Sequence, residues 1–524
     1  MDSTEYMKLQ NGSDIRGVAL SDESGEAVNL TPETAARIAS GFLIWLSGKT
    51  RKQPYSLVIA IGRDPRLSGQ EILNACAKTL QVYGVTILDC GLASTPAMFM
   101  STIFSDTRAD GAVMITASHL PKNRNGLKFF TRSGGLEKGD ITEILEHATS
   151  EEDLQVLHGA QKETIEKPKL MDRYAAYLRK LISERSGIKT KNGKVLAGLK
   201  IAVDAGNGSG GFFAQNVLEP LGADITASRY LDPDGSFPNH PANPENKEAM
   251  DSIREAVLDG ECDLGLIFDT DVDRSAAVDE TGRELSRNGI VAMASALIAD
   301  KYPGCTVVTD SITSEELTDY LEQDLGLRHF RYQRGYRNVI NKAKELNEEG
   351  TDAELAIETS GHAAFKDNYW LDDGAYLAAL IVIKTAILKR EGKTISSVVK
   401  DLKEPKEAKE IRMKLLKEDM TAGDRILASF EQTFQSADQA ADTPAGLSFT
   451  VTEPNYEGVR VSVSGSVHGW FLLRKSLHDP ILPLNIEAEE EGGIQKILPV
   501  IRKALSEFQD ILDLSGLTED AAQE

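Results

Sequence analysis

The chain has 524 residues, 41% of them hydrophobic and 27% charged, a balance that lets several domains of about 100–150 residues each bury a core. Its 81 acidic and 58 basic side chains give a formal net charge of −23, which disfavours nucleic acid and anionic membranes as partners. No apolar run approaches the roughly 20 residues of a membrane span.

The cysteines also bear on the class of protein. Cys76, Cys90, Cys262 and Cys305 are widely scattered and form no CxxC pair, which argues against a zinc site or a disulfide framework. The N-terminal residues lack the basic and apolar regions of a signal peptide. We therefore expect a cytoplasmic protein, with an organelle stroma as the alternative if a transit peptide has been removed.

The first part of the chain alternates helices and strands. Thr31 and Pro32 predict the start of a helix over residues 31–47, because threonine caps helix N-termini and proline fits the first helical position. An apolar strand, a glycine-containing loop, an amphipathic helix ending near Tyr83 and two further strands follow. The three predicted strands are Leu57–Ile61, Val85–Asp89 and Ala112–Ile115.

This order of elements recurs twice. It begins again at Ile201–Val203, where a helix to Leu221 is predicted, and once more at Val307–Val308. The later strands of these two units are predicted at Ala223–Ala227, Leu264–Phe268, His329–Tyr332 and Leu355–Ile357. Three such units with right-handed crossovers predict three related open α/β domains with mixed sheets.

The rest of the chain is of a different type. Residues 142–194 are charged and predicted to be largely helical, and residues 389–417 read as a Lys/Glu-rich linker after a helix over 375–388. Strands at 447–451, 458–463 and 469–473 and a helix over 494–512 predict a smaller α+β domain. We expect four domains, at residues 1–190, 191–300, 301–405 and 406–524.

The third strand of each unit ends in a cluster of polar side chains. Ligand groups collect at the carboxyl ends of strands in open α/β sheets, so three such clusters predict functional loops. The clusters are Thr116-Ala-Ser118-His119, Asp269-Thr-Asp271-Val-Asp273-Arg274 and Glu358-Thr-Ser360-Gly-His362.

The first cluster combines a hydroxyl with an imidazole and nearby cations. Ser118 follows a buried strand and precedes Lys122, Arg124 and Lys128. A serine in such surroundings is a candidate nucleophile or phosphate carrier. A helix N-cap serine in a polar loop is the alternative.

The second cluster is a candidate metal site. Asp269, Asp271 and Asp273 place alternate carboxylates on one side of an extended loop, and three carboxylates this close repel one another unless a cation is present. An EF-hand is excluded because Arg274 stands where its glycine is required. Mg²⁺ fits this set best, and a solvated acidic turn is the alternative.

A glycine-rich loop raises a competing enzyme class. Gly206-Asn-Gly208-Ser-Gly-Gly211 follows a strand and matches the GxGxxG pattern of dinucleotide-binding dehydrogenases. Asp204 precedes the glycines, however, and no well-placed acidic residue follows about 20 positions later. A tight strand-to-helix turn is the simpler interpretation.

Two further loops suit a phosphorylated sugar. Glu358, Ser360 and His362 offer a carboxylate, a hydroxyl and an imidazole for sugar hydroxyls, with a helix cap as the alternative. Arg474 and Ser476 stand at a predicted strand end, as a phosphate contact requires, with a solvated strand end as the alternative.

Together these loops resemble those of the α-D-phosphohexomutase superfamily, which includes phosphoglucomutases, phosphomannomutases and phosphoglucosamine mutases. The resemblance spans nearly the whole chain. It rests on the three clusters above and on Asn125-Gly-Leu-Lys128, Asp14-Ile-Arg16-Gly, Gly62-Arg63-Asp64-Pro-Arg66-Leu-Ser-Gly, Asp204-Ala-Gly-Asn-Gly and Gly335-Tyr-Arg337.

The resemblance implies a fold, an activity and a set of site residues. It implies four domains around a central cleft and reversible phosphoryl transfer between the 1- and 6-positions of a hexose phosphate, glucose first and mannose second. A phosphoserine and a hexose bisphosphate would be the intermediates. Mg²⁺ would be the metal, hexose 1,6-bisphosphate the activator, and the protein a monomer or homodimer.

The residues carried over fall into three groups. Ser118, His119, Lys128 and Arg16 would be catalytic, and Asp269, Asp271 and Asp273 would hold the metal together with Ser118. The expected substrate-binding residues are Glu358, Ser360, His362, Arg337, Arg274, Arg474, Ser476 and His478.

The chain departs from the family pattern in its fourth loop. The family shows Arg-x-Ser-Gly-Thr-Glu-Pro, whereas this chain has Arg474-Lys-Ser476-Leu-His478-Asp-Pro480. The loss of a glycine and a threonine hydroxyl allows a phosphotransferase that forms hexose bisphosphate without efficient mutase turnover. A phosphoglucosamine mutase, a non-catalytic phosphosugar-binding regulator and the dehydrogenase are the further alternatives.

Overall fold

The structure is a computed structural model that describes residues 2–23, 25–150, 152, 164–416, 421–435, 446–476 and 480–517. It divides into two compact units. Unit 1 comprises residues 1–297 and 360–400, and unit 2 comprises residues 298–359 and 401–524. Among the described residues, no helix combines the length and apolar character needed to cross a membrane.

The first sheet of unit 1 is mixed and follows the order β1-β2-β6-β5-β3-β4-β8, with β7 paired to β6. Strand β3 pairs in parallel with β4 and β5, whereas β6 pairs antiparallel with β5 and β2. The strands are β1 (Gln10–Asn11), β2 (Asp14–Val18), β3 (Val58–Arg63), β4 (Thr86–Leu92), β5 (Gly111–Ile115), β6 (Arg124–Thr131), β7 (Gly134–Gly135) and β8 (Ile165–Glu166).

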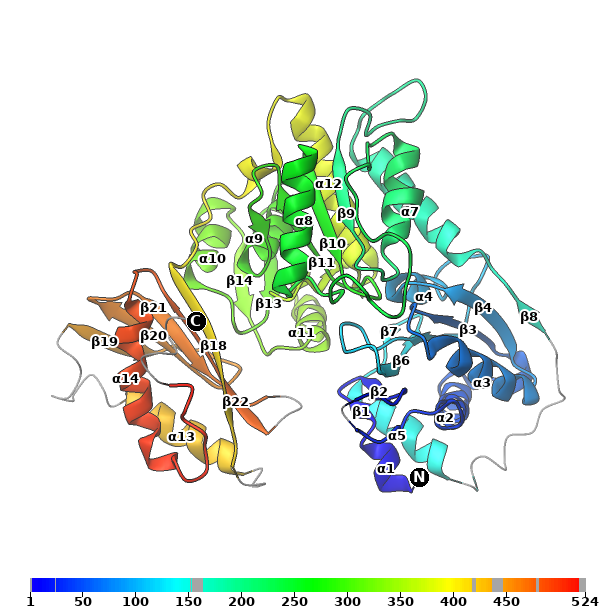
Figure 1. Ribbon diagram of the computed structural model, residues 1–524, viewed down its shortest axis with the longest axis horizontal. Coiled ribbons are helices and arrows are strands. Elements are labelled where there is room, and N and C mark those ends of the chain that lie inside the picture. Colours follow the sequence, from blue (N-terminus) through cyan, green and yellow to red (C-terminus); the bar gives the residue numbers. More distant parts are fainter. Residues whose placement is uncertain are drawn as a thin grey trace. The chain divides into compact units, whose positions relative to one another are not determined.

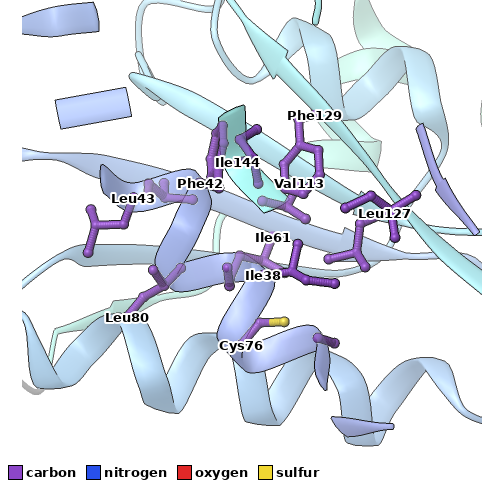
Figure 2. Packing of buried hydrophobic residues seen from close by; sticks show 14 of the residues in the cluster. Ile38, Phe42, Leu43, Ile61, Cys76, Leu80, Val113, Leu127, Phe129 and Ile144 are labelled. Carbon is purple, nitrogen blue, oxygen red and sulfur yellow. The ribbon is translucent and has the colours of Figure 1, made fainter. Parts of the chain in front are cut away.

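The helices that contribute buried residues to the core of this sheet are α1 (Ser3–Met7), α2 (Pro32–Thr50), α3 (Gly69–Val82) and α5 (Lys138–Thr149). α4 (Thr95–Met100) contacts β5 and β6, and α7 (Leu170–Arg185) contacts α4. Figure 2 shows Phe42 of α2 and Ile144 of α5 packed near Val113 and Phe129 of the sheet. Thr31 caps α2 through a hydrogen bond from the Thr34 amide, as the sequence predicts.

The second sheet of unit 1 has the order β12-β11-β10-β9. β10 pairs in parallel with β9 and antiparallel with β11, so this sheet is mixed as well. Its strands and the remaining elements of the unit are β9 (Ile201–Asp204), β10 (Leu264–Phe268), β11 (Ser275–Asp279), β12 (Glu284–Leu285), β16 (Ala363–Phe365), β17 (Leu371–Asp372), α8 (Lys247–Gly260), α12 (Gly374–Arg390) and α9 (Asn288–Ala299), which ends in unit 2.

Unit 2 contains the parallel strands β14-β13-β15 and an antiparallel sheet of order β18-β22-β21-β20-β19. α13 and α14 pack on the antiparallel sheet and contribute to its apolar core (Figure 1). The elements are β13 (Thr306–Thr309), β14 (Arg328–Arg331), β15 (Ala353–Ile357), β18 (Glu407–Lys414), β19 (Leu447–Val451), β20 (Val459–Gly465), β21 (Gly469–Leu473), β22 (Ile481–Ala488), α10 (Glu315–Asp319), α11 (Tyr336–Glu348), α13 (Ala422–Gln435) and α14 (Gly493–Leu505).

The mixed α/β fold class is confirmed, but several predicted elements are wrong. The strand predicted at 223–227 is only an isolated bridge between Lys200 and Asp224. The helix predicted before it is present and ends at Leu221, with π-helical and 3₁₀ turns over Phe213–Leu218 and Glu219–Leu221. Strand β18 occupies part of the predicted linker. Its sequence did not indicate a strand because its outer face is charged and, of its residues, only Ile411 and Met413 are buried. α14 ends at Leu505, short of the predicted Leu512.

Candidate functional site

Ser118 lies in the turn that follows β5. Its backbone has a φ of 52°, a left-handed conformation that is uncommon for a residue with a side chain, and the residue is buried. Its Oγ donates a hydrogen bond of 2.9 Å to Asp269 Oδ2 and accepts one of 3.2 Å from Nη2 of Arg274. The predicted nucleophile and the predicted metal loop are therefore in direct contact within unit 1.

The three aspartates of the metal loop form a buried cluster. They follow β10, and ligand oxygens of Asp269, Asp271 and Asp273 lie within 4.8 Å of one another. Asp271 Oδ1 and Asp273 Oδ1 are buried without a hydrogen-bond partner in the described chain. Buried acceptors of this kind are costly to leave unpaired, so the set fits a divalent cation that prefers oxygen ligands.

Two buried cations partly balance this cluster. Lys128 of β6 donates to Asp273 and, at 3.0 Å, to Asp271, while Arg274 Nη2 lies 3.0 Å from Asp269 Oδ2. Burial lowers the pKa of Lys128, but the charges of Asp271 and Asp273 outweigh this and hold the pKa well above its usual value. Lys128 is therefore a fixed positive charge.

The pKa values of Asp269 and Asp273 are shifted in opposite directions. Burial and the negative charges of Asp273 and Asp271 raise the pKa of Asp269 well above its usual value. Burial also acts to raise the pKa of Asp273, but Lys128, with His362 and Arg274, lowers it overall. The repulsion on Asp269 is the kind that a bound cation offsets.

Thr95 supports the metal loop and was missed by the sequence reasoning. It begins α4, and its Oγ1 donates a 2.5 Å hydrogen bond to Asp271 Oδ2 while its amide donates to the Asp271 carbonyl at 2.8 Å. The available signal was its place just beyond β4, at the carboxyl end of a parallel strand.

Arg16 and His119 also lie beside Ser118, as expected. Nη1 of Arg16 donates to the Thr116 carbonyl at 2.7 Å, and its Nη2 lies 3.0 Å from Asp14 Oδ2. Nδ1 of His119 is 3.4 Å from Ser118 Oγ. All four predicted catalytic residues therefore belong to one neighbourhood of unit 1.

His362 and Ser360 lie in unit 1 as well. His362 bridges to Arg274 through its backbone, and its Nδ1 contacts Asp372 Oδ2. Burial lowers the pKa of His362, but the charges of Asp372 and Asp273 raise it overall to about 9. A protonated imidazole thus adds a third cation near the aspartates, and Asp372 is a partner that the sequence reasoning missed.

The glycine-rich loop over residues 206–211 packs closely against the backbone of other parts of the chain. A Cβ on Gly208 would lie 2.8 Å from the Thr270 carbonyl oxygen, and one on Gly211 would lie 2.0 Å from that of Leu231. Asp204 accepts hydrogen bonds from the Gly206 amide and from His240. The glycines allow close packing of backbone against the metal loop, which favours the turn over a dinucleotide site.

Unit 2 contains the other predicted substrate-binding residues. Glu358 is buried and accepts a 2.7 Å hydrogen bond from the Gly335 amide, next to Arg337 in the first turn of α11. Asp310, which the sequence reasoning did not select, accepts from Thr359 Oγ1 at 2.8 Å. Asp310 therefore holds Thr359, and Glu358 holds the start of α11 at Gly335.

The fourth loop is only partly described. Arg474 is 4% exposed, yet its Nε has no hydrogen-bond partner among the residues that the structure covers. Burial lowers the pKa of Arg474, and the charge of Arg334 acts in the same direction. The Ser476 amide donates to the Ile481 carbonyl, whereas His478 lies outside the described residues.

Comparisons with known proteins agree with this arrangement. Models of the phosphoglucomutase/phosphomannomutase α/β/α domains I, II and III match residues 7–155, 172–282 and 287–405. A phosphomannomutase/phosphoglucomutase of Pseudomonas putida is 28% identical over 87% of this chain and 89% of the relative. A phosphoglucomutase of Neisseria gonorrhoeae is 28% identical over 84% and 86%, respectively.

Solved structures share the fold. A phosphoglucomutase/phosphomannomutase family protein of Burkholderia thailandensis matches with a TM-score of 0.75 and 24% identity, over 96% of this chain and 98% of that one. The matched domain models together cover most of the residues. The chain therefore belongs to the phosphoglucomutase/phosphomannomutase family of the α-D-phosphohexomutase superfamily.

Proposed function

We propose that this protein is an isomerase that moves a phosphoryl group between the 1- and 6-positions of a hexose phosphate through a phosphoserine at Ser118. The observation that carries the proposal is the contact between Ser118 Oγ and Asp269 in a buried cluster of carboxylates and cations. An N-cap serine does not require such a contact, whereas Ser118 Oγ lies against both Asp269 and the buried Arg274.

Asp269, Asp271 and Asp273 would hold Mg²⁺ together with an oxygen of the group on Ser118. When bound, the cation would draw negative charge from the transferring phosphoryl group. Transfer breaks the bond between phosphorus and Ser118 Oγ and forms one to a hydroxyl oxygen of the hexose phosphate. The proton that this hydroxyl loses returns Ser118 to its hydroxyl form. The other phosphoryl group of the resulting bisphosphate then returns to Ser118.

The flanking side chains divide the remaining tasks. Lys128 and Arg274 neutralise charge on the transferring group, because both are held cationic by aspartates and both lie at the cluster. Arg16 fixes the backbone before Ser118. Burial and the charge of Arg274 lower the pKa of His119 to about 3, so its neutral ring is the candidate proton acceptor among the four. Its Nδ1 lies 3.4 Å from Ser118 Oγ, whereas Lys128 stays protonated.

Substrate binding draws on further polar groups. Glu358, Ser360 and His362 bind sugar hydroxyls, and Arg337 assists from the first turn of α11. Arg474, Ser476 and His478 bind the phosphate that is not transferred. The buried Arg474 guanidinium supports this assignment, because a buried N–H donor without a partner is costly and a phosphate oxygen can accept from it.

Several finer assignments belong to the same proposal. Glucose 1-phosphate is the first substrate and mannose 1-phosphate the second, with hexose 1,6-bisphosphate as the activator. The protein works in the cytoplasm as a monomer or homodimer, without nucleic acid or membrane as a partner. Its domains are residues 1–190, 191–300, 301–405 and 406–524. A glucosamine phosphate substrate and a bisphosphate-forming phosphotransferase are the alternatives that the test below separates.

The test is intact-mass spectrometry of the purified protein before and after incubation with hexose 1,6-bisphosphate and Mg²⁺, followed by assays with each hexose 1-phosphate. We expect one phosphoryl group on Ser118 and formation of hexose 6-phosphate. Accumulation of bisphosphate without isomerisation would indicate the phosphotransferase. A protein that never carries phosphate and never isomerises a hexose phosphate would contradict the proposal.

A further inference from the structure

Arg66 is a fully buried arginine beneath the turn that carries Ser118. It lies between β3 and α3 and is 1% exposed. Its guanidinium donates to four backbone carbonyls of one loop. These are Ser118 O at 2.5 Å, Leu120 O at 2.5 Å, Pro121 O at 2.7 Å and Arg124 O at 3.1 Å.

Asp64 completes this arrangement from the same turn. Its Oδ1 accepts from the Arg66 amide at 2.9 Å, and its Oδ2 accepts from Arg66 Nε at 3.2 Å and from Thr116 Oγ1 at 2.7 Å. Thr116 Oγ1 in turn accepts from the Ser118 amide at 2.9 Å. The carbonyl and the amide of Ser118 are therefore both fixed by one buried ion pair.

The backbone of Ser118 needs such support. A left-handed conformation costs a residue with a side chain about 1–2 kcal/mol, and buried carbonyls outside a sheet need donors. Arginine supplies five N–H donors in a planar fork, whereas lysine supplies three from a single point. Arg66 uses two nitrogens for four carbonyls and a third for Asp64, so lysine cannot reproduce the set.

A loop of the second sheet covers Arg66. The guanidinium lies 5.4 Å from the centre of the Phe237 ring, and Arg66 forms an isolated parallel bridge with Gly235. Gly235 packs so closely that a Cβ there would lie 2.2 Å from the Pro65 carbonyl oxygen. Phe237 and Gly235 therefore pack directly against the turn that carries Arg66.

We propose that Arg66 is a positioning residue for phosphoryl transfer, which holds the Ser118 backbone so that Oγ faces the metal loop. This inference rests on the proposed function of Ser118. Among the described residues, the hydrogen bonds of the Arg66 side chain go to Asp64 and to the loop carbonyls, and none goes to the aspartate cluster. The charge of Asp271 also acts on Arg66, whereas the proposed effect of its hydrogen bonds is on the orientation of Ser118 Oγ.

A positioning role predicts a specific kinetic pattern. A misplacement of about 1 Å costs on the order of 10²-fold in rate, so Arg66→Lys should lower kcat by about this factor. KM for the hexose phosphate should stay near that of the unmodified protein, because the substrate-binding side chains are intact. Arg37→Lys is the matched control, since Arg37 donates to the Ala148 carbonyl within the same unit but holds no part of the Ser118 turn.

Chemical rescue separates positioning from a general loss of stability. In Arg66→Ala, added guanidinium should restore part of kcat as its concentration rises, whereas methylammonium should not. Restored thermal stability without restored kcat would overturn the proposal, as would an Arg66→Lys enzyme with unchanged kcat. Thr116→Val removes the other anchor of Ser118 and should also lower kcat more than it changes KM, so it provides the test if the Arg66 variants do not fold.

Different results would contradict the proposed function of Ser118 and the positioning role of Arg66. If the unmodified protein never carries phosphate on Ser118, the proposed function is wrong whatever the Arg66 variants do. If the unmodified protein is phosphorylated and active, and the Arg66 and Thr116 variants match it in kcat, only the positioning role is wrong.

Discussion

Ser118 Oγ and Asp269 Oδ2 are joined by a 2.9 Å hydrogen bond across 151 residues of sequence. Each residue stands beyond the carboxyl end of a strand in a different sheet of unit 1, Ser118 after β5 and Asp269 after β10. The contact brings a hydroxyl against a cluster that fits a divalent cation. The predictions below follow from this pairing and from the groups that hold it.

Replacing Ser118 should remove the phosphate carrier outright. We expect Ser118→Ala to take up no phosphoryl group and to lose all measurable turnover, because Ser118 Oγ is the hydroxyl that contacts both Asp269 and Arg274. Lys128→Ala removes one charge and should cost a smaller factor, on the order of 10²–10⁴-fold. Ser40→Ala, which loses only a bond to the Ala36 carbonyl within α2, is the control. Near-equal losses for Ser118→Ala and Lys128→Ala would count against these roles.

Thr95 should set the strength of metal binding. Thr95→Val removes the hydroxyl that donates to Asp271 Oδ2 and leaves the side-chain volume nearly unchanged. Loss of a partner behind a ligand costs about 10–100-fold in metal affinity, so Mg²⁺ titration calorimetry should show weaker binding by roughly this factor. Thr102→Val, which loses a bond to the Phe99 carbonyl, is the matched control. Unchanged Mg²⁺ affinity in Thr95→Val would show that Asp271 needs no such support.

Gly208 should be intolerant of a side chain. In Gly208→Ala the new Cβ would lie 2.8 Å from the carbonyl oxygen of Thr270, inside the metal loop. Overpacking of this kind costs about 1–3 kcal/mol, and the shifted loop should bind Mg²⁺ more weakly. Gly48→Ala has open space and should stabilise α2 by about 0.5–1 kcal/mol. If thermal unfolding and Mg²⁺ titration cannot distinguish Gly208→Ala from the unmodified protein, the close packing is not required.

His240 should make stability depend on pH. Burial lowers the pKa of His240, but its hydrogen bond to Asp204, the Asp204 charge, the Pro241 carbonyl and Glu248 raise it overall above 6.5. The protonated form is therefore favoured by folding, and its contribution is full below about pH 6.5 and declines as pH rises through the higher folded pKa.

The measurement for His240 is the unfolding temperature of the protein and of His240→Gln as a function of pH. The difference between the two should be largest at acid pH and shrink as the pH rises above about 6.5. Ser252→Ala, which removes an uncharged donor to Asp204, should show a difference that does not vary with pH over this range. A His240→Gln difference that grows with pH would reverse the sign of this account.

Much of the site could be predicted from the sequence because its residues are clustered. Ser118 and His119, or Asp269 to Arg274, are neighbours in the chain, and each cluster follows the carboxyl end of a strand, where ligand groups collect in open α/β sheets. Thr95 and Asp310 are single polar residues without a motif, so only the folded chain reveals their partners.

The elements that were missed have physical reasons of their own. β18 is an edge strand whose outer positions carry charges, so its sequence reads as a linker, and charged edges are a common protection against aggregation. Residues 223–227 look like a strand, but only Asp224 pairs with a neighbour. Arg66 stands in a recognisable motif, yet its four carbonyl partners depend on a turn whose conformation the sequence does not specify.

The central claim is that Ser118 carries a phosphoryl group during turnover. The most direct measurement is intact-mass and peptide mass spectrometry of the protein after incubation with hexose 1,6-bisphosphate and Mg²⁺, with Ser118→Ala in parallel. The account predicts one added phosphoryl group, located on Ser118, that is lost when excess hexose 1-phosphate is added. Phosphate that is absent, that lies on another residue, or that persists in Ser118→Ala would contradict it.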